Sequence, residues 1–183
     1  MTRGMGACVE LRGLQLADDS EARAAHAELA AEGFDFLPFF EPDEPWAEYL
    51  RRAGRLSRGD GLAPQYVPWT DLFGVVNGVV VGRVSVRHRL TEGLTLVGGH
   101  IGYGVRQAYR RRGYATELLC AGLGIAHDLG IHRALVTCDD DNVGSAAVIE
   151  RCGGVLEDVW SGPGSSPKRR YWLPTSVTLS PDS

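Results

Sequence analysis

The sequence predicts a single-domain α/β fold in which helices flank one mixed β-sheet, and three observations support this prediction. The chain has 183 residues and is 44% apolar and 23% charged, which suits one globular domain with a sizeable core. A clear hairpin signal lies near the middle, and β-rich segments alternate with helical ones after it. No repeat or linker divides the chain. We therefore expect one domain over residues 1–173 and a flexible polar tail over 174–183.

The first half is expected to contain a strand, two helices and the hairpin. The strand is expected over residues 9–16, and the helices over 21–31 and 46–57. Asp18, Asp19 and Ser20 provide side chains that can cap the first of these helices. The hairpin pairs residues 72–76 with 79–86. Asn77-Gly78 lies between them, and this dipeptide favours a type I′ turn.

The second half is expected to alternate strands and helices. A loop over residues 90–99 is expected to precede strands over 100–105, 133–138, 155–160 and 169–173. The strongest helical periodicity covers 114–129, with Gly113 before it and Gly130 just past its end. Asn142 is expected to cap a further helix over 143–152.

Composition and charge exclude several classes of protein. The net charge of −4 and the pI near 5.7 disfavour binding to nucleic acid or to an anionic membrane. Lys168 is the only lysine, so the Gly-Lys pair of a phosphate-loop NTPase is absent. There is no Cys-x-x-Cys pair, no secretory signal and no apolar run of about 20 residues. We expect a soluble, cytoplasmic protein.

The most informative stretch runs from Gly102 to Thr116, because a strand, an arginine-rich loop and the start of a helix follow one another there. Such a loop directs backbone N–H groups and the positive end of the helix dipole into one small volume. Gly113 lets the backbone approach a ligand closely, and the small side chain of Ala115 keeps the first helical turn free of bulk. A solvated arginine run is the alternative, but the strand–loop–helix order favours a site for an anion such as a diphosphate.

Two motifs in this order resemble a known family. Arg110-x-x-Gly113-x-Ala115 resembles the pyrophosphate-binding motif of the GCN5-related N-acetyltransferases (GNAT), and residues 142–154 resemble a later strand–helix segment of the same superfamily. Residues 99–103 and 148–157 resemble a bacterial group described only as predicted acetyltransferases, and ribosomal-protein N-terminal acetyltransferases are more distant relatives. The resemblance implies the GNAT fold, with acetyl-CoA bound between two splayed parallel strands.

The resemblance also implies which residues bind the cofactor. Val105 would pair with the pantetheine arm from one strand, and Asn142 would contact it from the other side. The diphosphate would lie on the N–H groups of the arginine loop. The complete implied set is Val105, Arg110, Arg111, Arg112, Gly113, Tyr114, Ala115, Thr116, Asn142 and Ser145.

The catalytic groups are less certain in the sequence, because Ile149 occupies the position where many relatives have a tyrosine that protonates the leaving thiolate. Ser145 matches a serine that some relatives carry, and it is the alternative acid; it could instead only stabilise the start of its helix. The thiolate could also leave directly into water, without a protein group that protonates it. His100, whose ordinary pKa is near 6.5, is the candidate general base, and a purely structural strand histidine is the alternative.

Aromatic residues before and within the hairpin are candidates for the acceptor site. Tyr66, Trp69 and His88 are predicted to bind the substrate, and Phe39, Phe40, Trp46 and Trp172 are further wall candidates. We predict no metal site, because consecutive carboxylates at Asp139–Asp141 diverge and fit a solvated loop better than a calcium loop.

The sequence therefore predicts an N-acetyltransferase that transfers the acetyl group of acetyl-CoA directly to a primary amine of a small molecule or a peptide N-terminus. The competing hypothesis is an inactive acyl-CoA-binding sensor or interaction module, and the missing tyrosine at Ile149 supports it. An ATP-binding protein is a third alternative. The sequence leaves open whether two chains pair as a homodimer.

Overall fold

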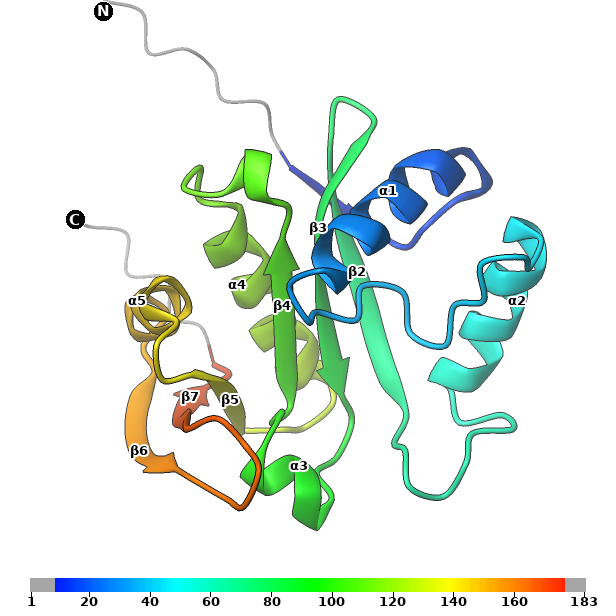
Figure 1. The fold of residues 1–183 in the computed structure, drawn as a ribbon. Helices are drawn as coiled ribbons and strands as arrows, with labels where there is room; N and C mark the ends of the chain where they lie inside the picture. Colours follow the sequence, from blue (N-terminus) through cyan, green and yellow to red (C-terminus); the bar gives the residue numbers. More distant parts are fainter. Residues whose placement is uncertain (1–8, 177–183) are drawn as a thin grey trace, which may run out of the picture.

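The computed structural model describes residues 9–176, which form one seven-stranded sheet with helices on both faces (Figure 1). The strand order is β1-β2-β3-β4-β5-β7-β6, and only β4 and β5 run parallel to each other. The strands are β1 (Glu10–Arg12), β2 (Trp69–Val76), β3 (Val79–Arg87), β4 (Ile101–Val105), β5 (Arg133–Asp139), β6 (Val155–Trp160) and β7 (Lys168–Pro174). This arrangement confirms the predicted mixed α/β fold.

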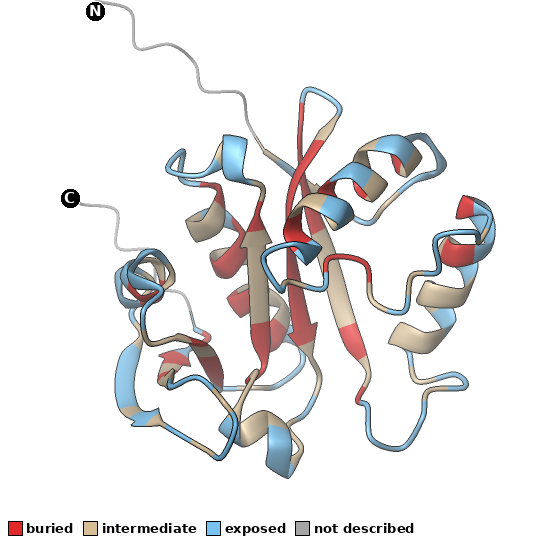
Figure 2. Cartoon of the chain, viewed as in Figure 1, coloured by how far each residue is buried: buried red, intermediate tan, exposed pale blue. Residues whose placement is uncertain are grey.

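The helices divide between the two faces of the sheet. They are α1 (Asp19–Ala30), α2 (Trp46–Ser57), α3 (Glu92–Leu96), α4 (Tyr114–Asp128) and α5 (Val143–Arg151), with 3₁₀ turns η1 (Leu16–Asp18) and η2 (Gln107–Tyr109). One core lies under α4 and includes Leu118, Leu119, Leu123, Val84 and Val86. The other lies under α1 and α2 and includes Ala22, Leu29, Phe36, Phe73 and Val80. Strand β3 is accordingly almost wholly buried, whereas the middle of β4 is only half-buried (Figure 2).

A glycine sets how closely α4 approaches the sheet. A Cβ at Gly122 would lie 2.8 Å from Cγ2 of Val84 and 3.1 Å from Cγ2 of Ile101, closer than packed atoms allow. The helix can therefore lie directly on the middle of the sheet only because this position has no side chain. This packing fixes the start of α4 beside the end of β4.

The hairpin and the helix starts follow the sequence closely. Asn77 (φ +52°) and Gly78 (φ +80°) both have positive φ, as a type I′ turn requires, and the turn joins β2 to β3. Asn142 caps α5, because its Oδ1 accepts a hydrogen bond of 3.0 Å from Ser145 N. Both predictions are confirmed.

The first strand is shorter than expected. Residues 9–16 were expected to be extended, but β1 ends at Arg12 and Leu16 begins η1. The reason is a buried ion pair: Arg12 donates two hydrogen bonds to Asp18 at 2.7 and 2.9 Å, and Gln15 N donates to the same carboxylate at 2.7 Å. These bonds close a tight turn that an extended strand would break.

Two predicted irregular segments contain ordered structure. Within the expected loop 90–99, Thr91 caps the short helix α3 by accepting a hydrogen bond from Leu94 N at 3.2 Å. Pro174 belongs to β7, and the buried Thr175 donates to Ile131 O at 2.6 Å, so the expected tail does not begin at 174. The rest of the predicted tail, 177–183, lies outside the described residues, as do residues 1–8 with Cys8.

Candidate active site

The sheet opens between its two parallel strands. β4 and β5 pair only at Ile101 and Val136, although both strands continue well beyond this point. Arg106 N donates to Val81 O on the other side of β4, and alternation along a strand therefore turns the backbone groups of Val105 and Tyr103 toward the opening. We call this opening between 101–105 and 136–139 the seam. Its edges can receive an extended ligand as an additional strand.

The arginine loop ends at the start of α4, beside the seam. Arg111 (φ +61°) and Gly113 (φ +92°) both have left-handed backbone conformations, which turn the chain sharply into the helix. The first hydrogen bond across a full helical turn runs from Glu117 N to Gly113 O, at 3.1 Å. The N–H groups of Tyr114, Ala115 and Thr116 consequently have no partner one turn back, and such an arrangement can bind an anion.

Helix α1 and the turn that follows it supply the acidic partners of this loop. Arg106 bonds Glu28 at 2.8 Å and Glu21 at 3.0 Å, and Arg110 is paired with Glu32. Glu28 also accepts a hydrogen bond of 2.8 Å from Gln107 N. These pairs fix the loop to a helix that is distant in the sequence, and the charge of Arg106 is largely neutralised by them.

The other two arginines of the loop remain available. Arg111 and Arg112 are exposed, and within residues 9–176 neither is paired with a carboxylate; Arg112 lies over the ring of Tyr109, 5.5 Å from its centroid. Their charges are thus free to act on an anion at the helix start. The structure places all the loop residues predicted to bind the cofactor in this one region.

The predicted residue Ser145 meets a residue of β4 that was not predicted. Ser145, in the first turn of α5, lies with its Oγ 2.8 Å from the hydroxyl of Tyr103 on β4. Burial raises the pKa of the Tyr103 hydroxyl well above its usual range, so this hydroxyl stays protonated. The side chain of Ile149, in contrast, is fully buried in the core. The sequence reasoning missed Tyr103, and the only signal for it was a large polar aromatic between Gly102 and Gly104.

His100 lies where β4 and β5 diverge, and it joins the two strands. The Nδ1 atom of its ring accepts a hydrogen bond from Leu135 N at 3.0 Å, and the backbone N–H of His100 donates to Leu135 O at 2.7 Å. Burial and the nearby Arg87 lower the pKa of the imidazole. In the neutral ring the proton is therefore on Nε2, and the one lone pair that could accept a proton is already used. This geometry favours a structural role.

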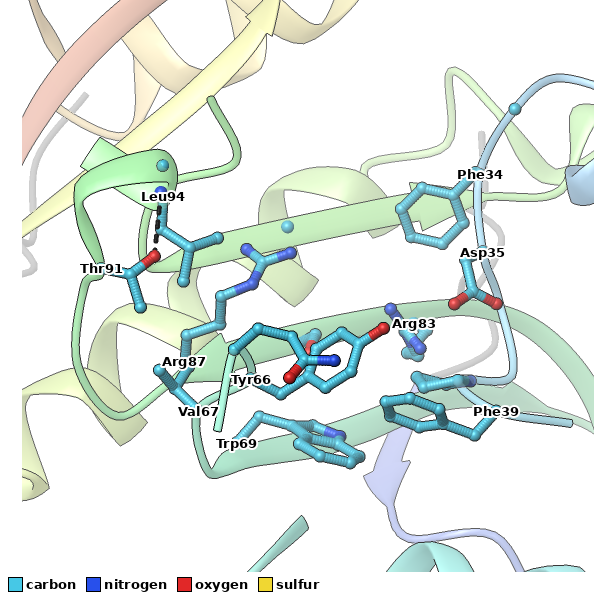
Figure 3. Close-up of a pocket in the computed structure, with 16 residues that line it drawn as sticks. Phe34, Asp35, Phe39, Tyr66, Val67, Trp69, Arg83, Arg87, Thr91 and Leu94 are labelled. Carbon is cyan, nitrogen blue, oxygen red and sulfur yellow. Dashed lines mark hydrogen bonds between the residues drawn. The ribbon is translucent and has the colours of Figure 1, made fainter. Parts of the chain in front are cut away.

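A cavity of about 520 Å³ lies on the face of the sheet that carries α1 and α2 (Figure 3). Tyr66 and Trp69 line it, as does Phe39, but His88 does not. The Nε2 of His88 lies 2.9 Å from the hydroxyl of Thr70 instead. The remaining lining includes Phe34, Asp35, Arg83, Ser85, Arg87, Thr91, Leu94 and Gly102. Two predicted substrate residues therefore share the cavity, and the third lies outside its lining.

The other aromatic candidates are elsewhere. Phe40 and Trp46 pack in the core under α1 and α2, and Trp172 lies beside His100 with ring centroids 6.5 Å apart. The sequence reasoning missed the polar floor of the cavity. The sequence signal for this floor was the alternation of Arg83, Ser85 and Arg87 with valines along β3, because alternate residues of a strand place their side chains on one face.

Two of the three consecutive aspartates at 139–141 form ion pairs within the protein. Asp139 pairs with Lys168, and Asp140 bonds Arg169 at 2.8 Å. Among the described residues, no group of three or more His, Cys, Asp or Glu side chains is placed to hold a metal ion. None of the described helices is long and apolar enough to cross a membrane.

Comparison with known proteins identifies the family. A family model described as the acetyltransferase (GNAT) domain matches residues 9–155, well over half of the chain. The chain therefore belongs to the GNAT acetyltransferase family, and the predicted resemblance is confirmed. A search of curated proteins found no significant match.

Solved structures share the fold at low sequence identity. The putative acetyltransferase yncA from Salmonella typhimurium, solved with acetyl-CoA, is 17% identical with a TM-score of 0.59, over 96% of this chain and 98% of that one. Ribosomal-protein-S5-alanine acetyltransferase from Vibrio fischeri is 15% identical with a TM-score of 0.62, over 92% and 93%. The microcin C7 self-immunity acetyltransferase MccE, solved with acetyl-CoA and AMP, is 17% identical with a TM-score of 0.60, over 91% and 92%. The predicted cofactor agrees with the family and with two of these structures.

Proposed function

We propose that this protein transfers an acetyl group from acetyl-CoA to a primary amine, with both substrates bound at once. The observation that carries the proposal is the position of Gly102. It lies on β4 at the edge of the seam, and it also lines the cavity on the opposite side of the strand from α4. A site for an extended thioester and a site for an acceptor thus meet at one strand.

The seam and the loop fit acetyl-CoA. A Cβ built at Gly113 would have only one neighbour within 4 Å, Oε1 of Glu117 at 3.9 Å, so there is space beside the unpartnered N–H groups of the helix start. Those groups, with Arg111 and Arg112, would hold the diphosphate. The Val105 backbone would bond the pantetheine arm, and Asn142 would contact it from the other wall. When bound, acetyl-CoA supplies a thioester whose C–S bond breaks as the amine nitrogen bonds the carbonyl carbon.

The seam also provides the groups that this reaction needs. N–H groups of β4 that face the seam would donate to the carbonyl oxygen as it gains negative charge. Ser145, backed by the hydroxyl of Tyr103, would donate a hydrogen bond to the sulfur as it leaves. A thiol has an ordinary pKa near 8.5, so stabilising its thiolate needs only modest help.

The residues support direct transfer without an acyl-enzyme. Burial raises the pKa of the Cys138 thiol, and it raises that of Cys152 to about 12. Both thiols therefore stay protonated and are poor nucleophiles near neutral pH. His100 is the base predicted from the sequence, but its lone pair is bonded to Leu135 N. We therefore infer that water in the cavity, rather than His100, removes the ammonium proton.

The alternative function is an acyl-CoA-binding module without catalysis, and the observation that favours it is the fully buried Ile149. One experiment separates the two. The protein is mixed with acetyl-CoA and a panel of amines, and free CoA thiol is followed together with the mass of the products. Thiol release with an acetylated amine supports the enzyme. Saturable CoA binding with no release above background on every amine supports the module.

A further inference from the structure

The floor of the cavity is unusually polar for the middle of a sheet. Arg83, Ser85 and Arg87 alternate along β3 and face the cavity, while Val84 and Val86 face α4. Arg83 and Ser85 are almost fully buried, with 6% and 5% of their surface exposed. Buried charges at the centre of a fold are costly, and they are retained where each has a partner. The partners of the two arginines differ.

Arg83 has an acidic neighbour within the protein. Its Nη1 donates to Phe36 O at 3.0 Å, and its Nε faces Oδ1 of Asp71 at 3.8 Å. That distance is too long for a hydrogen bond, so among the described residues these two buried atoms share an ionic contact but have no hydrogen-bond partner. Asp71 is itself held in place by the indole N–H of Trp69, at 2.6 Å. The charge of Arg83 is thus balanced by an acid of β2.

Arg87 has no acidic partner. Its Nη1 donates to Gly98 O and Gly99 O, both at 3.0 Å, and these carbonyls anchor the guanidinium. Across residues 9–176, no carboxylate lies within 4.0 Å of it. Its remaining N–H groups are directed into the cavity on the Leu94 side, whereas Asp35 lies on the Phe34 side, near Arg83 (Figure 3). An anchored arginine that lacks a counter-ion and faces a cavity is a site for an anion.

The mouth of the cavity is aromatic and held in a strained conformation. Phe39 has a positive φ of 60°, which is unfavourable for a residue with a bulky side chain, and its carbonyl accepts a hydrogen bond of 2.6 Å from Arg52. The rings of Phe39 and Tyr66 meet edge to face, 5.0 Å apart, and both are more than one-third exposed. They form an apolar wall on which a ligand could lie.

The anion site is close to the strand where acetyl transfer would occur. A Cβ at Gly102 would lie 3.9 Å from Nη1 of Arg87, with no closer neighbour. An acceptor whose amine reaches the edge of β4 would therefore place groups attached next to that amine beside the guanidinium. The absence of a side chain at Gly102 leaves the space between them open.

We propose that the acceptor is an amino-acid-like compound, with an anionic group beside its primary amine and an apolar or aromatic part. Arg87 binds the anionic group, and Phe39 and Tyr66 contact the apolar part. This inference rests on the proposed acetyl transfer, and it narrows the acceptor class. A carboxylate and a phosphate would both satisfy the guanidinium, so the test includes both.

The first arm of the test uses pairs of compounds on the wild-type protein. Initial rates of CoA thiol release are compared for phenylalanine and phenylalanine amide, in which a neutral amide replaces the carboxylate next to the amine. The rates are measured over a range of pH, because the amide also lowers the pKa of the neighbouring ammonium. We expect kcat/KM to be at least tenfold higher for the acid, since a charge-assisted hydrogen bond is lost with the amide. Phosphoethanolamine and ethanolamine form the second pair, and a preference for phosphoethanolamine alone would identify the anion as a phosphate.

The second arm uses variants. Arg87→Met should reduce either preference to less than twofold, and Arg87→Lys should retain part of it. Arg55→Met removes the same charge from the exposed face of α2, away from the cavity lining, and should change nothing. Thermal unfolding shows whether each variant is folded, since Arg87 also bonds two backbone carbonyls.

The outcomes separate this inference from the proposed function. Thiol release that is equal for both members of each pair would overturn the anion site and leave acetyl transfer standing. If no amine releases thiol, calorimetry with N-acetylphenylalanine and its amide tests the site without catalysis. Binding of the acid that is at least tenfold tighter, and lost in Arg87→Met, supports the site; equal binding of the two overturns it.

Discussion

Replacing His100 distinguishes a general base from a residue that joins two strands. The imidazole accepts the N–H of Leu135 at 3.0 Å and lies almost completely buried where the seam begins. His100→Phe keeps a planar ring and removes the acceptor. His100→Asn is the matched control, because its Oδ1 can take the position of Nδ1 and accept the same hydrogen bond without titrating.

The structure sets the expected size of each effect. In His100→Phe the N–H of Leu135 is left buried without an acceptor, which costs about 1–3 kcal/mol of the free energy of unfolding. His100→Asn should recover most of this loss at pH 7. A general base contributes roughly 10²–10⁴-fold to a rate, so both variants would lose that much activity if His100 removed the proton. We expect instead that His100→Asn retains the wild-type rate within about threefold, because the joined strands are preserved.

The pH dependence of stability has a definite sign. Burial and Arg87 hold the pKa of His100 below its ordinary value near 6.5, so the unfolded chain binds the proton more readily than the folded one. The contribution of the neutral imidazole to the free energy of unfolding should have its full value above pH 6.5. This contribution should fall as the pH decreases from there to the folded-state pKa, by up to about 1.4 kcal/mol per pH unit. The pKa of His88 is also lowered by burial, so the contribution of His100 is the difference between wild type and His100→Asn.

Urea unfolding between pH 5 and 8, measured together with acetyl-transfer rates over the same range, tests this account. The structural role predicts that His100→Asn loses the part of the pH dependence of stability that His100 contributes, and that it keeps the rate profile. A hundredfold loss of kcat/KM in His100→Asn, with the acidic limb of the profile abolished and stability unchanged, would refute it and restore His100 as the base.

Two further predictions concern the cofactor. Gly113→Glu places a carboxylate where the diphosphate should lie. Like charges about 4 Å apart repel by several kcal/mol near a protein surface. Calorimetry should therefore show that the affinity for CoA falls at least a hundredfold. Gly124→Glu, in open space on the same helix, should bind CoA normally, and equal binding by both variants would contradict the assignment of the loop. Tyr103→Phe removes the hydroxyl 2.8 Å from Ser145 Oγ and should lower kcat about tenfold to a hundredfold with little change in CoA affinity; an unchanged kcat would show that this hydroxyl serves only the packing of the seam.

Local sequence signals predicted those parts of the fold that depend on neighbouring residues. The turn at Asn77-Gly78, the cap at Asn142 and the helix after Gly113 each need only a few adjacent positions, and the structure has all three. Long-range or side-chain-specific bonds were not readable in the same way. The bond between Arg12 and Asp18 shortens the first strand, and nothing in the local pattern distinguishes that pair from ordinary surface charges.

The candidate site shows the same division. The strand–loop–helix order and the family motifs indicated the cofactor loop, since backbone N–H groups at a helix start depend little on side-chain identity. The cavity depends on segments that are far apart in the sequence, with Phe34 after α1, Tyr66 before β2 and Arg87 at the end of β3. Their meeting is set by the sheet, so Arg87 could not be assigned a role before the strands were placed.

Helix α1 connects the two halves of the site mechanically. Glu28 of α1 and Glu32 of the turn after it form ion pairs with the arginine loop. The same turn leads directly into the cavity wall at Phe34, whose ring lies 2.9 Å from where a Cβ of Gly104 would be. Because these ion pairs tie the arginine loop to α1 and to the turn after it, a displacement of the loop would also move the chain that leads to Phe34 at the cavity.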